Sequence, residues 1–88
     1  MEKEIIKELL ERYNLTAYDN IVDTYIKLIQ LGFNQTWLRN MCIIREFDEL
    51  YKTDKKVMDI YMDLGITYQD LSINHIRKII KERALYEI

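Results

Sequence analysis

The chain has 88 residues, 49% of them hydrophobic and 32% charged, with a formal net charge of −2. This length predicts a single domain over residues 1–88. The longest apolar run, residues 41–44, is far shorter than the roughly 20 residues that span a bilayer. The charged N-terminus does not resemble a signal peptide, and the single cysteine cannot form an intramolecular disulfide, so we expect a cytoplasmic protein. The net charge argues against a generally basic nucleic-acid coat protein, but it allows a local basic face.

The hydrophobic pattern is typical of helices almost throughout. The chain contains no proline, its apolar residues recur with a period near 3.6, and no long stretch alternates with period two. We therefore predict an all-α fold, a compact bundle of about five helices. The third helix is apolar around much of its circumference, so we expect it to be central. The expected helices span residues 2–13, 17–31, 35–51, 55–64 and 68–86, and the residues expected to be most buried are Met41, Ile43, Ile44 and Phe47.

Three boundaries between these helices share one pattern, at residues 13–16, 31–34 and 64–67. Each has an Asn or Gly, then an apolar residue, then a Thr or Asn. Glycine adopts positive φ at little cost, as a Schellman motif requires, and Thr or Asn can cap the next helix. The pattern predicts short Schellman and N-cap corners at Asn14, Gly32 and Gly65, with positive φ at both glycines. Thr53 or Asp54 is expected to cap the fourth helix.

The residues around Gly65 resemble a helix-turn-helix DNA-binding domain. With Gly65 at the turn, apolar residues fall where that family has them, at Ile60, Leu64, Ile66 and Leu71. Tyr61 replaces the usual small residue at the helix crossing, and Asn74 replaces an apolar one. The resemblance covers about 20 residues, and the segment around Gly32 fits the same pattern in part. It implies DNA binding by a unit over residues 55–86, with the last helix as the reader.

Polar and basic residues of the last helix form one outward arc on a helical wheel, opposite Ile76 and Ile80. Residues 71–88 carry four basic and two acidic side chains, a local charge of +2, whereas residues 1–24 carry three basic and six acidic ones, a local charge of −3. Lysine and arginine can neutralise phosphates, and asparagine and arginine can read base edges. The alternative is that these cations complement the helix dipole and solvate the surface. The candidate DNA-binding residues are Asn74, Arg77, Lys78 and Lys81, with Arg39 from a second polar cluster at the start of the third helix.

No motif indicates catalysis, a metal site or a cofactor. His75 has no Cys, Asp or Glu three or four positions away, and Cys42 lies in an apolar run that predicts a buried thiol. We therefore expect a non-enzymatic regulatory protein that binds double-stranded DNA. The alternative is an adaptor or inhibitor of the phage or plasmid accessory type, which binds a protein partner through acidic and aromatic helix faces. Either function is compatible with a homo-oligomer, because several of the seven tyrosines suit an interface.

Overall fold

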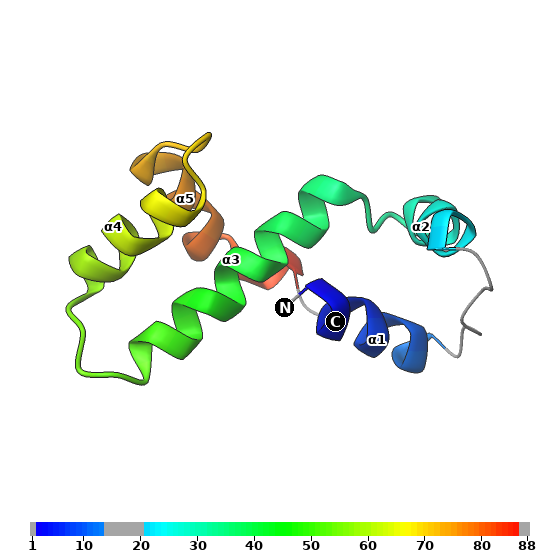
Figure 1. Cartoon of the computed structure of the whole chain (residues 1–88), viewed down its shortest axis with the longest axis horizontal. Coiled ribbons are helices and arrows are strands. Elements are labelled where there is room, and N and C mark those ends of the chain that lie inside the picture. The colour runs from blue at the N-terminus through cyan, green and yellow to red at the C-terminus, as the bar shows by residue number, and fades with distance from the viewer. Residues whose placement is uncertain (1, 14–20, 87–88) are drawn as a thin grey trace. The chain divides into compact units, whose positions relative to one another are not determined.

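The computed structural model describes residues 2–13 and 21–86 (Figure 1). Helices account for 79% of these residues, and no strand occurs in this part of the chain. The predicted all-α bundle of about five helices is therefore confirmed. The predicted corner at Asn14 lies outside the described residues. The elements are α1 (Glu2–Arg12), α2 (Ile21–Gln30), α3 (Gln35–Tyr51), α4 (Val57–Thr67), α5 (Ile73–Lys81) and a terminal 3-10 helix, η1 (Arg83–Tyr86).

The described residues divide into two compact units, and the boundary falls within α3, between Arg39 and Asn40. The first unit holds α1, α2 and the first turn of α3. The second unit holds the rest of α3, α4, α5 and η1. The single domain over residues 1–88 stays a prediction.

In the first unit, the corner between α2 and α3 is the predicted Schellman motif. Gly32 has φ 96°, and its N–H donates to the carbonyl of Ile29 at 2.9 Å. The N–H of Phe33 donates to the carbonyl of Leu28 at 2.8 Å, which is the second bond of the motif. Asn34 then caps α3, because its Oδ1 accepts from the backbone N–H of Trp37 at 2.9 Å. Both the positive φ and the cap were expected from the sequence.

The corner predicted at Gly65 is wrong. Gly65 lies inside α4, which continues to Thr67, and it is not among the positive-φ glycines. The Thr67 hydroxyl donates back to the carbonyl of Asp63, so Thr67 does not cap a following helix. The N-cap of α5 is Ser72, whose Oγ accepts from the backbone N–H of His75 at 3.1 Å. The turn between α4 and α5 therefore spans residues 68–72.

Replacing each of the two glycines by alanine is expected to change the stability of the protein in opposite directions. Gly32→Ala places a Cβ at φ 96° and should cost about 1–2 kcal/mol of unfolding free energy. Gly65→Ala should add about 0.5–1 kcal/mol, because alanine favours the helix and its Cβ would meet only the Cγ1 of Ile73, at an ordinary 3.5 Å. Urea denaturation of the two variants and the wild type measures whether each substitution lowers or raises the free energy of unfolding. A loss of stability in Gly65→Ala would contradict the helical placement of this residue.

The core of the second unit joins one side of α3 to α4 and α5. Phe47 lies in this cluster with an exposed fraction of 9%, between the rings of Tyr51 and Tyr61, at centroid distances of 5.9 and 5.6 Å. Burial of Met41, Ile43, Ile44 and Phe47 was expected and is confirmed. The fully or nearly buried members of the cluster are Ile43, Ile44, Phe47, Ile60, Leu64, Ile76, Ile79 and Ile80.

Several predictions at the ends of elements are wrong. α5 ends at Lys81 rather than 86, and Ala84 is exposed in η1. Two apolar residues near the ends of helices are also partly in solvent: Ile29 is 52% exposed and Ile73 is 39% exposed. Neither Thr53 nor Asp54 caps α4. The Thr53 hydroxyl donates to a carbonyl of α3, and the N-cap of α4 is Lys56, without a capping side chain.

The first unit is held by one buried face of each helix and a polar link between α1 and α2. Ile5, Leu9 and Leu28 are fully buried. The Tyr25 hydroxyl donates to Oε1 of Glu2 at 3.0 Å. Burial, with a smaller contribution from Glu2, raises the pKa of Tyr25. The tyrosine therefore stays neutral and remains a donor for this bond.

Candidate nucleic-acid interface on α5

The sequence of α5 gives it one buried and one polar side. One side of α5 carries three isoleucines at helical spacing: Ile76, Ile79 and Ile80. All three are buried in the core of the second unit. The Ser72 cap fixes where the helix begins, so it also fixes which residues face away from the core. Asn74, Lys78 and Lys81 are exposed and Arg77 is half-buried. The wheel predicted this arrangement correctly, although it assumed a longer helix.

These four side chains line one shallow hollow together. The hollow has a volume of about 340 Å³ and is lined by Asn74, Arg77, Lys78, Lys81 and Glu82. Three cations and one carboxylate give it a local charge of +2. A concave, positively charged surface with an amide at one end suits a polyanion such as a phosphate backbone. Glu82 was not expected at this surface.

Arg77 is held in place by an aromatic ring of α4. Its guanidinium carbon lies 5.9 Å from the centroid of the Tyr61 ring, within cation–π distance. The Tyr61 ring in turn packs on Phe47 and on the core cluster. In the helix-turn-helix resemblance, Tyr61 counted as a departure at the helix crossing. In the structure it supports the guanidinium of Arg77, a role that spacing along one helix could not reveal.

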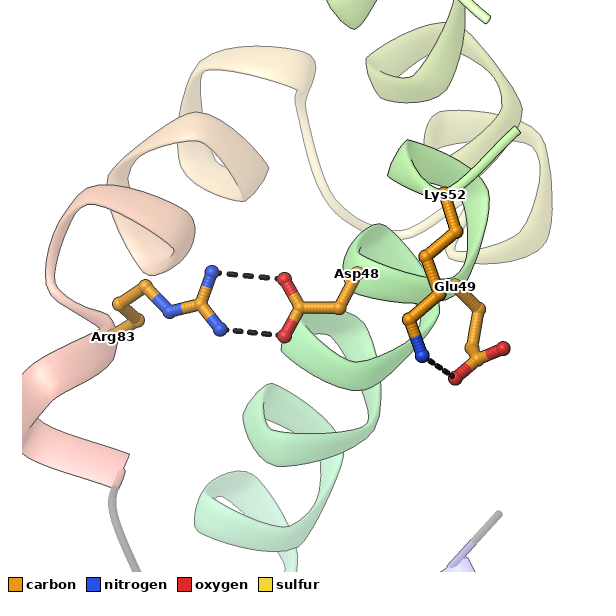
Figure 2. A network of polar contacts seen from close by, with 4 residues as sticks. All are labelled: Asp48, Glu49, Lys52 and Arg83. Carbon is orange, nitrogen blue, oxygen red and sulfur yellow. Dashed lines mark hydrogen bonds and ion pairs between the residues drawn. The ribbon is translucent and has the colours of Figure 1, made fainter. Parts of the chain in front are cut away.

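Arg83 is not part of the basic arc. Its two terminal nitrogens donate to the two carboxylate oxygens of Asp48 on α3, at 2.9 and 2.6 Å (Figure 2). This paired geometry ties η1 to α3. Lys52 is likewise occupied nearby, since its Nζ lies 3.2 Å from Oε1 of Glu49. The cations available for a ligand near the end of the chain are therefore fewer than the sequence count suggests.

The second polar cluster, at the start of α3, spans the boundary between the two units. Arg39 is half-buried, has interactions of its own and belongs to the first unit. Asn34 is occupied as an N-cap. Asn40 is 5% exposed, and its Nδ2 donates to the hydroxyl of Tyr86 at 2.9 Å. The cluster thus consists largely of residues with structural partners, and a DNA contact by Arg39 stays a prediction.

The helix-turn-helix pattern holds only in part. Ile60 and Leu64 are buried and Leu71 packs against the core, as the pattern requires. Ile66 is 69% exposed, so its expected packing is wrong, as is the position of the turn. What remains is a pair of packed helices, α4 and α5, joined by residues 68–72, as Figure 1 shows.

Other candidate chemistry can be placed within the described residues. Cys42 is buried, as expected, and His75 is exposed. Across residues 2–13 and 21–86, no group of three or more His, Cys, Asp or Glu side chains could hold a metal ion. None of the helices in that same part of the chain has the length and apolar character needed to cross a membrane.

Comparison of the chain with protein-family models, with curated proteins and with solved structures found no match.

Proposed function

We propose that this chain is a small, non-enzymatic regulatory protein that binds double-stranded DNA through α4, the 68–72 turn and α5. The supporting observation is that Asn74, Arg77, Lys78 and Lys81 line one open hollow on α5. An α-helix with its side chains is about 10–12 Å in diameter, so the nine-residue α5 can enter a major groove about 12 Å wide. Lys78 and Lys81 contact phosphates, and Asn74 and Arg77 contact base edges.

The geometry of Arg77 favours this assignment of roles. Its guanidinium rests on the Tyr61 ring and is half-buried, so little side-chain entropy is lost when it binds. A fixed planar guanidinium suits bidentate recognition of a guanine edge. The lysines are exposed, with no ion pair within the described residues, and act as mobile point charges.

Titration of a mixed-sequence duplex with the wild-type protein at 50 and 200 mM salt tests the proposal. Each phosphate neutralised contributes a slope of about −0.9 in log K against log salt, so the two lysines that contact phosphates give a slope of about −1.8. Affinity should therefore fall about 12-fold between the two salt concentrations. No duplex binding at low salt, or binding that does not respond to salt, would contradict the proposal.

The alternative is a protein-binding adaptor or inhibitor. It is favoured by side chains of α4 that stay exposed although they are apolar: Met58, Met62 and Ile66. In that case the duplex titration gives no binding at 50 mM salt, and the acidic and apolar surface of α4 carries the function instead.

A further inference from the structure

One side of α4 is apolar and uncovered. Met58, Met62 and Ile66 are 55%, 53% and 69% exposed. They are four residues apart, so they stand one above another along the same side of the helix. We call this set the α4 stripe. Soluble proteins rarely leave such a continuous apolar strip in water unless another surface covers it.

Gly65 and Ile73 lie beside the stripe. Gly65 has no side chain, and a Cβ built there would meet only the Cγ1 of Ile73 at 3.5 Å. Ile73 is itself 39% exposed. The apolar Ile73 side chain of α5 therefore lies next to Gly65 and extends the apolar surface beside the stripe.

The two borders of the stripe carry opposite charge. Asp59 and Asp63 each come one position after a methionine of the stripe, so they lie 100° around the helix on one side. Asp63 is paired with Nζ of Lys55, so Asp59 supplies the acidic charge of this border. Tyr61 precedes Met62 by one position and therefore lies on the other side, where Arg77 of α5 covers its ring. The face thus runs from an acidic border through apolar residues to a basic border.

We propose that the α4 stripe is the interface with a second copy of this chain, in a dimer whose twofold axis runs parallel to α4. Such an axis places the acidic border of each copy against the basic border of the other, so Asp59 faces the partner's Arg77. An antiparallel arrangement would instead place Asp59 and Asp63 against their own equivalents. The face is therefore self-complementary in one orientation, as an interface between two identical surfaces requires.

The interface is small. α4 has 11 residues and is about 16 Å long, so the stripe and its borders bury less than the roughly 800 Å² per partner of a standard interface. A dimer held in this way is weak and forms at micromolar to submillimolar concentration. Its detection needs measurements over a wide range of protein concentration.

Sedimentation equilibrium of the full chain from about 5 to 500 µM tests the proposal without DNA. The average mass should rise from 10.8 kDa towards twice that value. Met62→Asp should hold the mass at one chain, whereas Leu85→Asp, at a position 71% exposed on η1, should leave the association unchanged. Circular dichroism of both variants establishes that they are folded.

A charge exchange provides a second test that does not alter the apolar stripe. Asp59→Arg and Arg77→Asp should each weaken the dimer about tenfold or more, because like charges then meet across the axis. The double variant should recover most of the association. A wild-type mass of one chain at 500 µM, or a double variant as weak as the single ones, would overturn the proposal. Sedimentation is measured without DNA, so a failure of the dimer leaves the DNA proposal to its own experiment. The dimer and the base contact compete for Arg77, because the dimer places this side chain against the partner's Asp59.

Discussion

Replacing Phe47 by alanine should lower the free energy of unfolding by about 3–5 kcal/mol. The ring is 9% exposed and belongs to the cluster that joins α3 to α4 and α5. The substitution leaves a cavity and also removes the ring contacts with Tyr51 and Tyr61. Total stabilities of small domains are about 5–15 kcal/mol, so this loss could unfold the second unit at room temperature.

Urea denaturation followed by far-ultraviolet circular dichroism measures the loss. Tyr51→Ala is the matched control, because that ring also stacks on Phe47 but is 62% exposed. It should cost about 1 kcal/mol or less, the size of one aromatic pair. If Phe47→Ala and Tyr51→Ala shift the midpoint equally, α3 does not hold the core of the second unit.

The sequence predicted helices best where packing and capping agree. The bounds of α3, Gln35–Tyr51, were predicted to the residue, because Asn34 caps its start and its apolar residues continue over four turns. Gly32 was predicted correctly for a related reason. The left-handed glycine is succeeded by an apolar residue and then by a side chain that caps the next helix.

The same three-residue pattern predicted a wrong corner at Gly65. The pattern does not include the residues that follow it, and the turn between α4 and α5 lies among those residues. The helical cost of one glycine is only about 1 kcal/mol, and tertiary packing can outweigh it. Around Gly65, α4 packs on the core through Ile60 and Leu64, and this packing outweighs the helical cost of the glycine. The N-cap of α5 is Ser72, and serine is a residue type that often caps helices. It stands directly before the apolar pattern of α5, so the sequence did indicate where this helix begins.

The candidate site divides in the same way between local and long-range features. The arc of Asn74, Arg77, Lys78 and Lys81 results from spacing on one helix, so the wheel predicted it. The Tyr61 ring beneath Arg77 comes from another helix. The Asp48–Arg83 pair joins residues 35 positions apart. Contacts of this kind depend on how helices pack, which no single-helix pattern specifies.

Neutralising two lysines of α5 should have the largest effect on DNA binding. In Lys78→Ala/Lys81→Ala, two of the three cations in the hollow are lost while Arg77 keeps its place over Tyr61. The slope of log K against log salt should fall in magnitude by about 1.8, and affinity at 50 mM salt should drop on the order of 100-fold. The loss should be the same for every duplex sequence, since phosphate contacts carry no sequence information.

Lys3→Ala/Lys7→Ala is the matched control. It removes the same charge from exposed positions of α1, outside the hollow and outside the proposed DNA-binding elements. If net charge alone governs binding, the two double variants lose affinity equally, and the hollow has no special role. If α5 is the DNA-binding surface, the control keeps a salt slope within about 0.5 of the wild-type value, because neither of its lysines contacts a phosphate. Asn74→Ala in the same assay should instead bring cognate and random duplexes closer in affinity, since it removes a base contact and leaves every cation in place.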